Sequence, residues 1–308
     1  MFTRDSKFLD RLRVPGRPKR WIALAAPVAA ATALSMVPLA ASNAATPSVA
    51  RMGGASAPAR PAAALPVMTF KMNGKTVSVG GTLKSGAERI LFTVTGEASG
   101  GPTLVRVDNG VSLSQFFKGF AAAGQDPNNL YGLGQIVMST QANKGTSSVY
   151  VDLAPGTYAA LDTNAPTKTP PFTVFAVTRA KHPAALPKPG ATVTSIEFGF
   201  RGATVLHQGE MVRWANSGFL VHMIFGAQAP NLATAEKIAA LLKAGKDNAA
   251  EALAIGSYVW DGALSHGQSF QSVISQPRGF WVIACFMDTQ DGREHTTFGM
   301  EKVIQILK

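Results

Sequence analysis

The sequence predicts an all-β protein made of two tandem Greek-key β-sandwiches, each with a short helical insertion. Charged residues make up only 15% of the 308 residues, whereas Gly and Pro are frequent, with 30 and 19 copies. This balance is typical of short strands and turns. Short apolar alternations recur along the chain, and its two halves resemble each other. Together these observations predict two sandwich domains of similar size.

The strands are predicted from alternation of apolar and polar residues, which places one face of a strand in a core. Four such segments are residues 89–94, 148–153, 210–215 and 270–275. Each half also contains a helical stretch, at 113–123 and 233–243. In the second stretch, Ala235, Ile238, Leu241 and Leu242 fall on one face at helical spacing.

Landmark residues of the two halves align at a nearly constant shift of about 122 positions. The aligned pairs are Gly134 with Gly256, Gly145 with Gly267, and Pro155 with Pro277. Because the matches are collinear, we interpret the chain as a tandem repeat. The predicted domains are 67–180 and 193–308, joined by a Pro-rich linker at 181–192.

The N-terminal residues have the pattern of a secretory signal peptide. Residues 1–20 are basic, 21–41 are apolar, and 42–44 offer small residues for cleavage after Ala44. The alternative is an uncleaved membrane anchor, since the apolar stretch is long enough to span a bilayer. Either way we expect a secreted or cell-envelope protein, tethered through an Ala/Pro-rich segment at 45–66. Membrane contact is expected only through an uncleaved N-terminal segment.

The net charge gives little indication of a nucleic-acid partner. The formal charge is +11, but residues 1–44 hold seven of the 29 basic and two of the 18 acidic residues. The remaining 22 basic and 16 acidic residues leave +6. No run of Lys and Arg with interleaved aromatic residues follows, so we expect no nucleic-acid binding.

Cys285 is the single cysteine of the chain. Exported proteins use cysteines in pairs, so an unpaired cysteine calls for an explanation. It cannot form an internal disulfide, so it is a buried thiol, a reactive thiol or a metal ligand. His295 and Met300 follow it, and His222 precedes it. One thiolate, two imidazoles and a weak axial thioether form the ligand set of mononuclear copper electron-transfer sites.

The order of these residues is an isolated His, then Cys, then His and, after four further residues, Met. This order resembles that of the cupredoxin family, of which plastocyanin is a small member. The resemblance implies a β-sandwich that binds one copper through His222, Cys285, His295 and Met300. The first half has no such set: Pro102 and Asp162 align with His222 and Cys285. Copper binding is therefore predicted for the C-terminal half alone.

Two features depart from the family pattern. Nine residues separate Cys285 from His295, and they include three carboxylates that could replace or supplement a ligand: Asp288, Asp291 and Glu294. Met223 follows the first histidine where many members of the family have an Asn that braces the cysteine loop. Both features weaken the prediction of fast electron transfer more than that of metal binding.

The sequence favours a carrier over an enzyme. None of the five histidines forms a His-x-His pair, and Phe286, not a histidine, follows the cysteine, which disfavours multicopper-oxidase and nitrite-reductase chemistry. We expect an exported protein that transfers electrons or carries copper, with a redox protein or a copper donor or acceptor as its partner. The alternative is a non-catalytic cell-envelope binding module without a metal. In a structure, the four residues should converge if the first hypothesis is correct.

Overall fold

The structure, a computed structural model, describes residues 64–123, 126–167 and 169–308. The predicted signal peptide and most of the predicted tether lie outside these residues. The described chain from Leu65 onward belongs to one compact unit. Within the described residues, no helix has both the length and the apolar character needed to cross a membrane.

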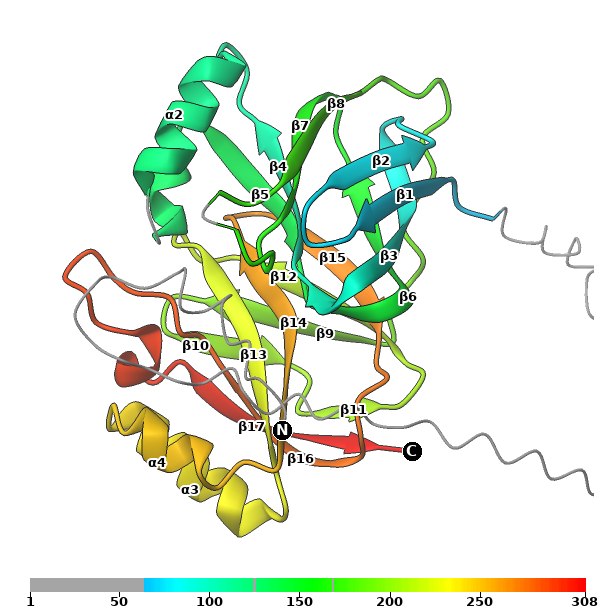
Figure 1. The fold of residues 1–308 in the computed structure, drawn as a ribbon. Coiled ribbons are helices and arrows are strands. Elements are labelled where there is room, and N and C mark those ends of the chain that lie inside the picture. The colour runs from blue at the N-terminus through cyan, green and yellow to red at the C-terminus, as the bar shows by residue number, and fades with distance from the viewer. Residues whose placement is uncertain (1–63, 124–125, 168) are drawn as a thin grey trace, which may run out of the picture. The chain divides into compact units, whose positions relative to one another are not determined.

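Three sheets contain the strands (Figure 1). The eight-stranded sheet has the order β10-β9-β12-β15-β6-β3-β1-β2. Its strands are β1 (Val67–Met72), β2 (Val77–Gly81), β3 (Gly86–Gly100), β6 (Ala142–Leu153), β9 (Ala191–Ile196), β10 (Gly199–Gly202), β12 (Met211–Asn216) and β15 (Ser269–Val273).

A four-stranded and a five-stranded sheet complete the two sandwiches, in the orders β5-β4-β7-β8 and β11-β17-β16-β13-β14. The first contains β4 (Pro102–Val107), β5 (Gly134–Ser139), β7 (Gly156–Asp162) and β8 (Phe172–Val177). The second contains β11 (Val205–His207), β13 (His222–Ala229), β14 (Gly256–Leu264), β16 (Gly279–Ala284) and β17 (Glu301–Leu307).

The helices are α2 (Leu113–Ala123), the 3-10 turn η1 (Pro127–Leu130), α3 (Leu232–Lys243), α4 (Asp247–Glu251) and the 3-10 turn η2 (His295–Phe298). Helices α2 and η1 lie between β4 and β5, and α3 and α4 lie at the corresponding place between β13 and β14, whereas η2, between β16 and β17, belongs to the second half alone in the described residues. The two predicted helices thus correspond to α2 and α3. In α3, Ala235, Ile238 and Leu242 are buried, as their spacing predicts, whereas Leu241 is only partly buried at the edge of this face.

The two halves share one scheme of strand pairing. Strand β1 pairs antiparallel with β2 and parallel with β3, and β9 pairs in the same way with β10 and β12. Strand β4 lies between β5 and β7, as β13 lies between β14 and β16. The predicted all-β fold of two Greek-key sandwiches with helical insertions is confirmed. The residue-by-residue repeat stays a prediction.

The two sandwiches are joined through the eight-stranded sheet. Strands β15 and β6 pair antiparallel, with Phe270 opposite Val151. Polar contacts between the halves add to this pairing: Thr140 Oγ1 donates to the Trp260 carbonyl at 2.9 Å and the Ile136 N–H to Ser265 Oγ at 2.9 Å. The halves therefore share backbone and side-chain hydrogen bonds.

Two clusters of buried apolar side chains form the core, and each contains residues of both halves. The first includes three tryptophans, with Trp260 packed between Trp214 and Trp281 at ring-centroid distances of 5.5 and 5.2 Å. The second includes Cys285 and Met300. The cysteine therefore lies in a well-packed region, where side chains have little freedom to move.

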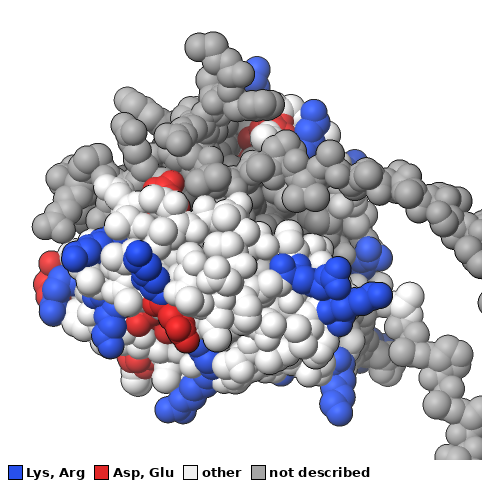
Figure 2. Space-filling view, turned by 90° about the horizontal axis from the view of Figure 1, so that it is seen from below, with Lys and Arg blue, Asp and Glu red and all other residues white. Residues whose placement is uncertain are grey.

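Charged side chains are dispersed on the face of the molecule drawn in Figure 2. Lys and Arg occur around an uncharged area, and acidic residues lie among them.

Candidate metal centre

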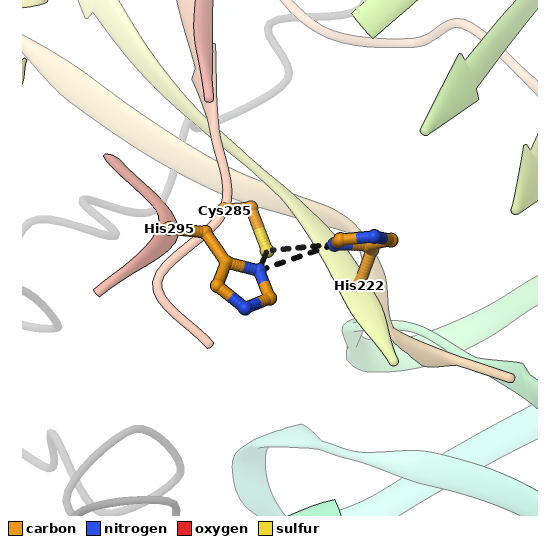
Figure 3. A group of neighbouring side chains, drawn as sticks. All are labelled: His222, Cys285 and His295. Atoms are coloured by element: carbon orange, nitrogen blue, oxygen red, sulfur yellow. Dashed lines mark hydrogen bonds between the residues drawn. The ribbon is translucent and has the colours of Figure 1, made fainter. Parts of the chain in front are cut away.

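Three of the four predicted ligands lie together in the C-terminal sandwich. The Nδ1 atoms of His222 and His295 are 3.2 Å apart, and Cys285 Sγ lies 3.8 Å from the first and 3.4 Å from the second (Figure 3). All three residues are fully buried. Two imidazole nitrogens and one sulfur thus face a common point.

His222 is the first residue of β13, and a buried asparagine positions the loop before it. The Asn216 side chain donates to the carbonyls of Leu220 and Leu264, at 2.8 and 2.7 Å. Its Oδ1 accepts the Gly218 N–H at 2.8 Å. An unpaired buried amide would destabilise the fold, so the loop must keep its hydrogen bonds to Asn216. These bonds therefore determine where the chain enters β13.

His295 returns to Cys285 because the long gap between them folds into a small hairpin. Asp288 and Glu294 form an isolated antiparallel bridge, and the Thr289 N–H donates to the Arg293 carbonyl at 2.8 Å. The His295 N–H then donates to the Met287 carbonyl at 2.9 Å. The nine-residue gap is therefore compatible with convergence of the two ends.

The hairpin also locates the carboxylates that the sequence left as possible ligands. None of Asp288, Asp291 and Glu294 belongs to the group formed by the cysteine and the two histidines. Asp291 is exposed and forms an ion pair with Arg293 at 2.7 Å. The facing donor atoms are thus two nitrogens and one sulfur.

Met300 lies beside this group. It is fully buried, and its N–H donates to the His295 carbonyl at 3.1 Å. Its own carbonyl accepts the Cys285 N–H, also at 3.1 Å. The backbone of Met300 therefore connects two of the candidate ligands, and its role as the axial ligand stays a prediction.

The thiol of Cys285 is neutral in the absence of a metal. Burial raises its pKa to about 12, although the backbone N–H groups of Met223 and Met287 oppose the shift. The Met223 N–H points at Sγ at 3.4 Å. Met223 stands where the family pattern has Asn, yet its backbone contributes a hydrogen bond to the sulfur.

The imidazoles are neutral as well. Burial, together with the neighbouring His295, lowers the pKa of His222 to about 3. Burial also lowers the pKa of His295 to about 4, although the charges of Asp126 and Glu197 oppose this shift. Neutral imidazoles have a free lone pair for a metal ion.

The separations between the donor atoms suit a transition-metal ion. Metal–nitrogen bonds of about 2.0 Å and metal–sulfur bonds of about 2.3 Å, at trigonal angles, place the donors roughly 3.5 to 3.7 Å apart. The three observed separations range from 3.2 to 3.8 Å. The residues therefore fit a copper ion in size and in donor type.

Sequence patterns gave no indication of several residues around this group. Asn128 of the N-terminal half accepts the Val221 N–H at 2.7 Å, next to His222. Asp126, also of that half, lies close enough to raise the pKa of His295. Glu197 and Phe198 approach from the β9–β10 turn. No local motif links these positions to the ligands, because the contacts form only in the folded chain.

Comparison with known proteins gives distant structural likenesses only. No family profile matches the chain, and neither does any curated protein. Auracyanin B is similar at 17% identity, over 40% of this chain and 92% of that chain, with a TM-score of 0.25. The copper nitrite reductase of Nitrosomonas europaea is similar at 11% identity, over 78% of this chain and 93% of that chain, with a TM-score of 0.22. Because these scores are low, the fold class rests on the strand pairing.

Proposed function

We propose that this chain is an exported, cupredoxin-like protein that binds one copper ion through His222, Cys285, His295 and Met300. The supporting observation is the convergence of Cys285 Sγ and the two histidine Nδ1 atoms, within 4.8 Å of one another, inside a buried region. A copper ion bound there would supply one-electron redox chemistry.

The protein's own residues would prepare and protect this centre. The thiol loses its proton when the metal binds, and the Met223 N–H stabilises the resulting sulfur charge. Apolar neighbours such as Phe286 and Met287 exclude water. Because backbone hydrogen bonds hold Cys285 and His295, the donors need to move little between oxidation states.

We further propose a carrier rather than an enzyme. The chain has no His-x-His pair from which a second, catalytic copper centre of the oxidase type could be built. A single enclosed centre suits electron transfer or copper carriage. The expected partner is then a redox protein or a copper donor or acceptor outside the cytoplasm.

Copper loading of the full chain tests this proposal. We expect one copper per chain by elemental analysis and an intense visible thiolate-to-copper band for the Cu(II) form. Cys285→Ser should abolish the band, because serine cannot supply the sulfur donor. His207→Ala, at an exposed histidine in β11, is the matched control and should keep it.

Two outcomes would contradict the proposal. A protein that takes up no stoichiometric metal would favour the alternative of a cell-envelope binding module. If the protein retained zinc in the presence of excess copper, the proposed metal site would stand, but the proposed redox function would be contradicted.

A further inference from the structure

The tight turn between β9 and β10 places two side chains against the candidate metal centre. Ile196 pairs with Gly199 across the turn, so Glu197 and Phe198 form its tip. Phe198 has a φ of 56°, in the left-handed region, and is the single non-glycine residue with a positive φ in the described chain. Such a backbone conformation is unfavourable for a bulky residue and persists where surrounding contacts hold it.

The ring of Phe198 covers His295. Their centroids are 5.2 Å apart and the rings are nearly perpendicular, at 81°. The other contact of Phe198 is a stack on Phe298 at 4.6 Å, and the Arg293 guanidinium lies 4.3 Å from the Phe298 ring centre. The unfavourable backbone at Phe198 therefore coincides with a side chain that shields one candidate ligand.

The carboxylate of Glu197 faces the other imidazole. Its Oε1 lies 4.0 Å from His222 Nε2, and it accepts the N–H groups of Phe219 and Leu220. His222 Nε2 is buried and has no hydrogen-bond partner among the described residues. The carboxylate is thus the nearest charged group to the outer nitrogen of this histidine that the structure records.

A glycine keeps this approach open. A Cβ at Gly218 would lie 2.6 Å from both Glu197 Oε1 and His222 Nε2. Any larger residue at this position would therefore separate the carboxylate from the imidazole. The sequence thus has its smallest residue at a position where a side chain would block the contact.

We propose that the Glu197–Phe198 turn is a functional part of the metal centre, an inference that rests on the proposed function. Glu197 is a positioning residue that favours the His222 tautomer with its proton on Nε2, which leaves the Nδ1 lone pair facing Cys285 Sγ. Phe198 shields His295 from water and from external chelators.

The first test reads the tautomer in metal-free protein and so does not depend on copper. Nitrogen chemical shifts of His222 in the full chain should report a proton on Nε2. Glu197→Gln should increase the population with a proton on Nδ1. A wild-type protein with the proton already on Nδ1 would overturn the role of Glu197.

The second test compares copper-loaded variants of the full chain. Glu197→Gln removes one negative charge near the metal, so we expect a higher reduction potential and a loss of about 10- to 100-fold in Cu(II) affinity by chelator competition. Glu210→Gln, at another glutamate beside a histidine, is the matched control and should leave both unchanged. Wild-type affinity and potential in Glu197→Gln would overturn the proposal while the proposed function stands.

The third test separates shielding from simple structural support. Phe198→Gly relieves the unfavourable backbone but also removes the ring contacts with His295 and Phe298, so urea unfolding of the metal-free variant is measured alongside to record any change in stability separately. The same change opens the path to His295, so a chelator should remove copper at least several-fold faster. A release rate equal to that of wild type would overturn the shielding role. Wild-type protein that binds no copper would instead contradict the proposed function itself.

Discussion

At the scale of single residues, the centre depends on which nitrogen of each imidazole faces inward. Both Nδ1 atoms point toward Cys285, and both Nε2 atoms are buried without a hydrogen-bond partner in the described chain. Buried polar atoms without a partner cost free energy. The proposed metal site would account for this arrangement, because it needs both Nδ1 atoms on the side of Cys285.

A buried carboxyl pair in the N-terminal sandwich makes stability depend on pH. Burial, together with the hydrogen bond and charge of Asp162, raises the pKa of Glu97 to about 8. Asp162 is the residue that the predicted repeat aligns with Cys285, and its Oδ1 accepts the Gly101 N–H at 2.9 Å. If that alignment holds, the first half has an acidic residue where the second half has its thiol.

This pair yields a prediction with a definite sign. Because the folded state holds the Glu97 proton more tightly than the unfolded state, stability should fall as the pH rises from about 4.5 to about 8. Glu97→Gln should flatten this dependence and stabilise the protein at the upper end. Urea midpoints at about pH 5 and about pH 8 measure both effects. Glu236→Gln, on the exposed face of α3, is the control, and an equal pH slope in Glu97→Gln would contradict the prediction.

At the scale of elements, the short turn η2 carries the chain from His295 to Met300. Gly299 ends this turn with a φ of 97°, in the left-handed region. Its N–H is bonded to the carbonyls of His295 and Thr296. This conformation allows the Met300 N–H to reach the His295 carbonyl, so the glycine determines the spacing of the two candidate ligands.

Gly299→Ala tests the importance of this spacing. A Cβ would meet only the Lys243 side chain, at 3.8 Å, so the cost comes from the backbone and should be about 1 kcal/mol or more. We expect weaker copper binding as well, because the turn would shift. Gly145→Ala, with a φ of 109° and no neighbour within 4 Å, should lose similar stability and keep its copper affinity. Equal copper affinity in both variants would refute the link between the turn and the centre.

Local patterns predicted the regular elements well. The alternation at 148–153 corresponds to the C-terminal half of β6, and that at 210–215 to most of β12. The helical stretch 113–123 matches the bounds of α2. Period-two and helical spacing report burial directly, so these elements can be found without knowledge of the tertiary fold. His222 begins β13, Cys285 directly follows β16 and His295 begins η2, and these three of the four expected ligands lie together.

The surroundings of the centre could not be predicted. A turn residue with positive φ is expected to be Gly or Asn, so Phe198 gave no signal of a turn there. Asn128 lies 93 positions from Val221, and only the contact between the two halves brings them together. Such contacts depend on tertiary packing, and no short-range pattern in the sequence indicates them.

At the scale of the whole molecule, the two sandwiches share their sheet, their core and part of the metal-site environment. Both clusters of buried side chains contain residues from each half. The polar contact of Thr140 with the Trp260 carbonyl is also buried, and that of the Ile136 N–H with Ser265 is partly buried. Neither half could unfold without breaking its contacts with the other.

We therefore expect the halves to unfold together. Scanning calorimetry of the metal-free full chain should give one transition, whose calorimetric and van't Hoff enthalpies agree. If the protein binds copper, the whole transition should move upward on loading, because the ion binds only the folded form. Two transitions, only one of which responds to copper, would show that the sandwiches are independent.

The pairing of β15 with β6 has a further consequence for solubility. Each strand would otherwise be the outer strand of its own sheet, with a row of unsatisfied N–H and C=O groups open to other chains. Their union leaves β10 and β2 as the outer strands of the shared sheet, and β10 has only four residues. Fusion of two sheets thus removes two sites at which copies of this protein could aggregate edge to edge.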